Sequence, residues 1–132
     1  MYSKEIMDRF VNPENAGGLR GANGVGKVTN DLTSDMMKMY LQIDEDGRIE
    51  EARFKTFGCC VAIASSDLAC DLIKGKTIEE ALQVTNQDML AVLGEMPAYK
   101  EHYTVMAESL IHSAIEDYYK RKEKESRRIA QE

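Results

Sequence analysis

Two adjacent cysteines, Cys59 and Cys60, are the residues of this sequence best suited to metal or sulfur chemistry. They stand in the stretch FKTFGCCVAIASS, between an alternating segment and a run of small residues that can begin a helix. Unpaired amides and the helix dipole at such a junction stabilise a thiolate and make it more nucleophilic. Neighbouring cysteines seldom form a metal site alone, so Asp35 and His102 are the candidate additional ligands. The alternative is a purely structural thiol at Cys59.

The remaining cysteine, Cys70, lies in near-register with Ala62 and Ser66 on a helical segment, which predicts a buried and inert thiol. Three cysteines without an apparent export signal indicate a reducing compartment, and we expect the cytoplasm. No segment approaches the roughly 18 apolar residues of a membrane span. The net charge of −6 argues against a general nucleic-acid binder.

Two further motifs have ordinary interpretations. The stretch GANGVGKV nearly matches a phosphate-binding loop, but Val28 occupies the position of the magnesium-binding hydroxyl, so we expect a flexible loop. The run Lys120–Arg128 holds six basic and two acidic residues. It predicts a solvated helix end, and a docking patch for an acidic partner is the alternative. In this sequence no Ser/His/Asp order and no paired-carboxylate motif stands out, so we do not expect an enzyme.

The first half of the chain predicts a small sheet. A short amphipathic helix over residues 2–10 ends at Asn12-Pro13, and a glycine-rich loop follows over 15–26. Strands are expected at 26–29, 36–43 and 48–57, with the turn DEDG between the last two. Their order predicts an antiparallel meander.

The second half predicts helices. One begins at Val61 and ends at Lys74-Gly75, and two capping boxes follow at 77–80 and 85–88. A long last helix runs from about Tyr99 to the C-terminus. Its apolar stripe consists of Met106, Leu110, Ile111, Ala114, Ile115 and Tyr118. The chain therefore predicts one α+β domain over residues 1–132, with a three-stranded antiparallel sheet packed against several helices.

Several stretches closely resemble the NifU/IscU-type iron–sulfur cluster assembly scaffolds. They are YSKEIMDRFVNPENAG, SDMMKMYLQI, ARFKTFGCCVAIASSDLACDLIKGKTIEEAL and KEHYTVMAESLIHSAIEDYYK. The pattern FGC-x-x-AIASS followed by LIKGKT-x-EEAL is highly specific, and the resemblance extends from Tyr2 to about Lys120. It implies the same sheet-and-helix fold and a single NifU/IscU-like domain.

The resemblance also implies a function. Members of this family assemble a [2Fe–2S] cluster on three cysteines at the tip of the sheet, beside an aspartate and a histidine. A cysteine desulfurase supplies sulfur as a persulfide, and the finished cluster passes to apo iron–sulfur proteins.

The family site is only partly kept in this sequence. Asp35, Cys59 and His102 stand at family positions, whereas Thr33 and Tyr103 occupy the positions of the other two cysteines. Cys60 replaces a glycine of the family pattern. The chaperone-recognition stretch LPPVK of some members reads MPAYK over residues 96–100.

Three functions remain open at this point. The first is a scaffold with a rearranged site for iron or a [2Fe–2S] cluster, built from Cys59, Cys60, His102 and Asp35, to which Tyr103 can add a phenolate. The second is a mononuclear Zn²⁺ or iron site. The third is a degenerate scaffold that only binds a desulfurase or another partner. A homo-oligomer that shares a cluster between protomers would supply further ligands.

Overall fold

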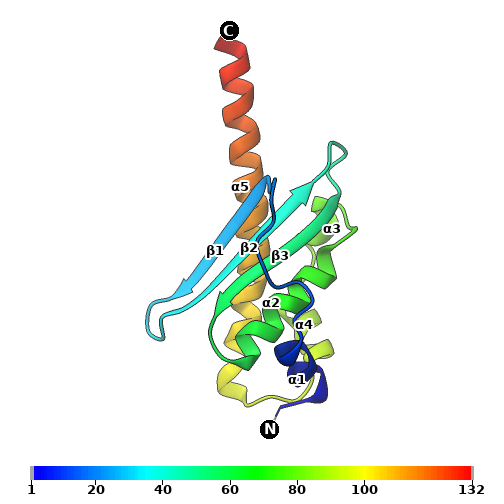
Figure 1. Cartoon of the computed structure of the whole chain (residues 1–132), viewed down its shortest axis with the longest axis vertical. Coiled ribbons are helices and arrows are strands. Elements are labelled where there is room, and N and C mark those ends of the chain that lie inside the picture. The colour runs from blue at the N-terminus through cyan, green and yellow to red at the C-terminus, as the bar shows by residue number, and fades with distance from the viewer. Residues whose placement is uncertain (1, 132) are drawn as a thin grey trace.

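A computed structural model of the chain describes residues 2–131 (Figure 1). The sheet and its covering helices follow one another in the order that the sequence predicts. The elements are α1 (Lys4–Val11), β1 (Gly24–Asn30), β2 (Asp35–Ile43), β3 (Ile49–Phe57), α2 (Cys60–Ile73), α3 (Ile78–Ala81), α4 (Asn86–Leu93), the 3₁₀ turn η1 (Ala98–Lys100) and α5 (His102–Gln131).

The three strands form an antiparallel sheet in the order β1-β2-β3, which confirms the predicted meander and the α+β class. Strand β2 alternates strictly, because Met37, Met39, Leu41 and Ile43 are all buried while the residues between them are partly exposed. Helix α5 packs on β1 and β2, and α2 packs on β3. Both helices cover the same face of the sheet (Figure 1), so the apolar side of the strands forms the core.

Several boundaries differ from the sequence prediction. The first helix begins at Lys4 instead of residue 2, and α5 begins at His102, after a separate 3₁₀ turn, instead of at about Tyr99. Strand β1 begins at Gly24, within the stretch expected to be loop, because Gly24 and Gly26 pair with Leu41 and Met39 of β2. Glycines weaken a strand pattern unless another backbone must come close, and here α5 does. Helix α2 begins at Cys60, one residue before the predicted start at Val61.

The N-terminal segment is fixed to α2 and to the edge of the sheet. The Arg9 guanidinium pairs with Asp67 and Asp71 of α2, each at 2.7 Å. Residues 15–17 then hydrogen-bond to Phe54 at the edge of β3. The chain continues across the outer face of the sheet to the start of β1 (Figure 1), which leaves the other end of that face open.

The apolar stripe predicted for the last helix is confirmed, since its six residues are all buried on α5. Beyond Tyr118, α5 projects past the sheet (Figure 1), and the run Lys120–Arg128 is exposed there. Among the described residues, no helix is long and apolar enough to cross a membrane.

Close packing of α5 on β1 gives the first testable prediction. A Cβ at Gly26 would lie 2.5 Å from the backbone nitrogen of Ala114, and neither backbone can yield without moving α5. We expect Gly26→Ala to lower the free energy of unfolding by about 2 kcal/mol, as overpacking does. Gly18→Ala is the matched control, because its Cβ would meet only the flexible end of Lys55, at 3.5 Å. Urea denaturation of both variants checks the prediction, and equal losses of stability would contradict it.

Candidate functional site

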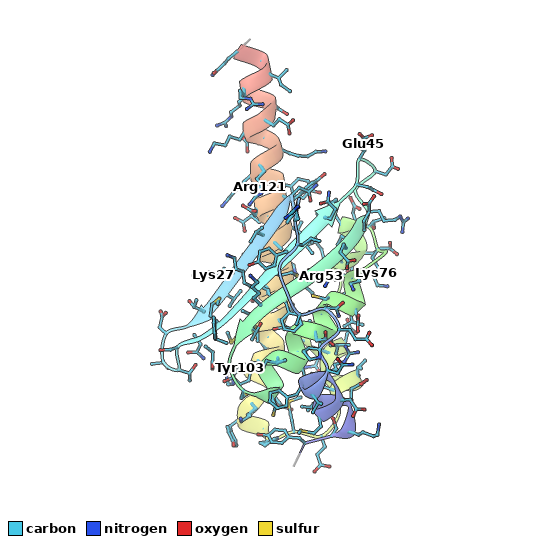
Figure 2. All side chains as sticks on the ribbon, viewed as in Figure 1. Lys27, Glu45, Arg53, Lys76, Tyr103 and Arg121 are labelled. Carbon is cyan, nitrogen blue, oxygen red and sulfur yellow. The ribbon has the colours of Figure 1, made fainter. Side chains whose placement is uncertain are left out.

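Three chain segments meet at the end of the sheet where α5 begins. Asp35 is the first residue of β2, Cys59 directly precedes α2, and Tyr103 lies in the first turn of α5. The Tyr103 hydroxyl donates a hydrogen bond to Oδ2 of Asp35, which joins the strand to the helix. Figure 2 labels Tyr103 at this end of the molecule, far from the projecting part of α5.

A glycine brings the end of β3 close to Asp35. A Cβ at Gly58 would lie 3.2 Å from Oδ1 of Asp35 and 2.8 Å from Cβ of Ala62. The backbone that leads to Cys59 therefore passes directly beside the second carboxylate oxygen.

Asp35 is held as an anion. Partial burial opposes its ionisation, but hydrogen bonds from Thr33 and Tyr103 and the charges of His102 and Lys100 outweigh that cost and lower its pKa. The Thr33 hydroxyl reaches Oδ2 at 2.6 Å, the same oxygen that accepts from Tyr103. Thr33 and Tyr103 thus both donate to the same oxygen of Asp35.

Tyr103 is a phenol donor in this arrangement. Its side chain is buried, and burial, the hydrogen bond to Asp35 and the nearby Cys59 all raise its pKa well above the ordinary value. The predicted use of Tyr103 as a phenolate ligand therefore requires a metal ion to displace a strongly held proton, and it stays a prediction.

The two cysteines occupy different backbone positions. Cys59 is the N-cap of α2, with an extended backbone (φ −80°, ψ −178°) and no side-chain capping hydrogen bond. Cys60 is already the first helical residue, so the two are not an extended pair. Both thiols are partly exposed, whereas Cys70 is fully buried, and burial raises its pKa far above the ordinary value. The prediction of a buried Cys70 is confirmed.

Lys100 supplies a positive charge beside Cys59, a contact that the sequence did not reveal. A hydrogen bond with Tyr2 raises the pKa of Lys100 most, and the charge of Cys59 and a hydrogen bond with it raise it further. The ammonium also lies 5.6 Å from the centre of the Tyr2 ring. Cys59 is therefore flanked by a lysine and by the Tyr103 hydroxyl.

His102 presents one ring nitrogen to solvent. Its Nδ1 lies 3.0 Å from the carbonyl oxygen of Tyr99, which can only accept, so Nδ1 carries the proton. Nε2 of the neutral ring is then free to act as an acceptor or a metal ligand. A backbone carbonyl that holds the other nitrogen is the usual support for a ligating histidine.

The turn before Asp35 is strained. Ser34 has φ +62°, the left-handed region, and among the described residues it alone does so without being glycine. The strain is confined to the link between Thr33 and Asp35, whose side chains are joined by a hydrogen bond.

The predicted site residues Asp35, Cys59, His102 and Tyr103 thus lie together, with Cys60 next in the chain. Within residues 2–131, however, no three His, Cys, Asp or Glu side chains are arranged closely enough to hold a metal as they stand. Their roles as ligands stay predictions.

The protein is thus an α+β protein whose three-stranded antiparallel sheet carries a cysteine, an aspartate and a histidine at one end. The family model of the NifU-like N terminal domain matches residues 1–125, and the chain belongs to that family.

The chain is 43% identical over 121 residues to iron–sulfur cluster assembly scaffold protein IscU 1 of Archaeoglobus fulgidus, covering 92% of this chain and 78% of that protein. It is 39% identical over 125 residues to the IscU scaffold protein of Escherichia coli, covering 92% and 97%. An N-terminal NifU-like protein from Brucella abortus has the same fold, with a TM-score of 0.69 at 20% identity over 89% and 94% of the two chains.

The hydrogen bond between Tyr103 and Asp35 gives the second prediction. Tyr103→Phe removes a donor that favours the ionised carboxylate, so the pKa of Asp35 is expected to rise. Tyr99→Phe is the control, because the Tyr99 side chain is exposed. NMR titration of the Asp35 carboxyl carbon measures the change, and an unaltered pKa in Tyr103→Phe would contradict it.

Proposed function

We propose that this protein is an iron–sulfur cluster assembly scaffold with a rearranged site, on which iron and sulfur are received as cargo at Cys59. The observation that supports this most is the convergence of Asp35, Cys59 and His102 beside a positive charge at one end of the sheet. Its relatives in Archaeoglobus fulgidus and Escherichia coli carry the name of such scaffolds.

The proposed ligand set draws four groups from one protomer, and these must move closer together than they stand in the structure in order to share iron. Cys59 and Cys60 contribute thiolates, His102 contributes Nε2, and Asp35 contributes Oδ1, the oxygen not used by Thr33 and Tyr103. Thiolates are the principal ligands of iron–sulfur clusters, and histidine replaces some of them in known sites. The set suits a [2Fe–2S] cluster or iron.

The proposed sulfur donor is a cysteine desulfurase. The Cys59 thiolate attacks the terminal sulfur of the donor persulfide, the S–S bond breaks, and the donor thiolate leaves. The product is a persulfide anion on Cys59, beside the Lys100 ammonium. Apo iron–sulfur proteins are the proposed recipients, and the protein turns over no substrate of its own.

The third prediction separates Cys59 from the other thiols. Ferrous iron and sulfide are added to the protein without air, and the visible absorbance of the product is recorded. We expect Cys59→Ala to abolish the absorbance and Cys60→Ala to reduce it strongly, because each removes a thiolate from the proposed set.

Cys70→Ala is the matched control, since Cys70 is fully buried and away from the solvent. It is expected to keep the absorbance of the unaltered protein. Full absorbance in both Cys59→Ala and Cys60→Ala would refute the rearranged cluster site. Loss of stoichiometric metal in His102→Ala, without any sulfide in the parent protein, would instead indicate a mononuclear site.

A further inference from the structure

Three lysines form a straight row across the outer face of the sheet. The strand register places Lys27 of β1 opposite Lys38 of β2, and Lys38 opposite Lys55 of β3. Adjacent strands lie about 4.8 Å apart, so three positive charges follow one another across the whole width of the sheet. We call Lys27, Lys38 and Lys55 the lysine row. In Figure 2, Lys27 on β1 and Arg53 on β3 mark the two sides of this region.

The lysine row is unfavourable for folding. Like charges directly opposite each other on paired strands destabilise a sheet. Over residues 2–131, no ion pair joins any of the three lysines to a carboxylate. The Tyr40 ring offsets part of this cost, because its centre lies 5.4 Å from Nζ of Lys38 and 5.9 Å from Nζ of Lys55.

The α5 carboxylates that share a hollow with Lys27 are already engaged. Glu116 and Asp117 lie beside Lys27 in a shared hollow, but they pair with Lys120 and Arg121 at 3.1 and 2.9 Å. The chain as a whole carries a net charge of −6. Within the described part of the chain, this concentrated positive row on an acidic protein therefore has no carboxylate partner that would explain it.

The lysine row also lies between two distinct features of the outer face. The next residues toward the site are Met36 and its cross-strand partner Phe57, and the Phe57 side chain is 72% exposed. Asp35, a residue of the candidate site, immediately precedes Met36 at the start of β2. On the far side, the glycine-rich segment crosses the sheet (Figure 1). The lysine row thus lies between this segment, whose Gly18 is close to the end of the Lys55 side chain, and the candidate site.

We propose that the lysine row is a docking surface for an acidic segment of a partner protein, which it seats beside the candidate site. Carboxylates of the partner supply the neutralising charges that the sheet lacks, and the exposed Phe57 adds an apolar contact next to them. This proposal is independent of what the site binds, because it requires only the sheet register and the charges.

A binding experiment with matched charge changes tests the proposal. The probe is a fluorescein-labelled peptide of ten glutamates, and its anisotropy is measured at low and at physiological salt. The row variant carries Lys27→Gln, Lys38→Gln and Lys55→Gln. The control variant carries Lys120→Gln, Lys122→Gln and Lys124→Gln on the projecting part of α5, and it loses the same net charge.

The row variant is expected to bind the peptide at least tenfold more weakly, and the control variant within twofold of the unaltered protein. The melting temperature of the row variant is expected to rise by several degrees, because the like charges are gone. This second measurement shows that the variant is folded.

Three results would overturn the proposal. Equal peptide affinity in the row variant and the unaltered protein would exclude docking at the row. A loss confined to the control variant would place the binding on the end of α5. The third result is that single-stranded DNA with ten phosphates binds the unaltered protein more tightly than the peptide does, and that the row variant loses this binding. The row would then be a nucleic-acid surface.

Discussion

The site depends on how closely the backbone of α5 can lie on the sheet. Gly24 and Gly26 leave no side chain between β1 and the main chain around Ala114, so the helix rests directly on the strand. This contact fixes the position of α5 on the sheet. It therefore also fixes where Tyr103, at the start of α5, meets Asp35 of β2. A side chain between β1 and α5 would move the start of α5 away from β2 and break the hydrogen bond between Tyr103 and Asp35.

At the site itself, one oxygen of Asp35 accepts two side-chain hydrogen bonds. Thr33 and Tyr103 donate to Oδ2 of Asp35, whereas Oδ1 faces the backbone before Cys59. The two hydroxyl groups thus stabilise the ionised form of Asp35. Cys59 and Cys60 are the proposed sulfur ligands of this site, and in that proposal Lys100 balances the negative charge that sulfur transfer would place on Cys59.

Much of the fold follows from local patterns, and the site follows from them only in part. Strict alternation predicted β2, and the change of period after Cys59 predicted α2 within one residue. The start of strand β1 was not predicted, because its glycines look like a loop in the sequence. They are needed where the backbone of α5 packs against the strand, which is a tertiary constraint. The contact between Lys100 and Cys59 and the bond from Tyr103 to Asp35 join residues 41 and 68 positions apart, and no local pattern reports them. The lysine row is likewise invisible until the register of three strands is known.

The central claim is that a site with two of the family cysteines replaced still assembles iron with sulfur. Its most direct test is the content of iron and acid-labile sulfide per protomer, in protein purified without air. The account predicts near-equal amounts of iron and sulfide. Zinc or iron without sulfide would contradict it in favour of a mononuclear site. Neither metal nor sulfide, even after supply of iron, cysteine and a desulfurase, would mean that the fold serves only to bind partners.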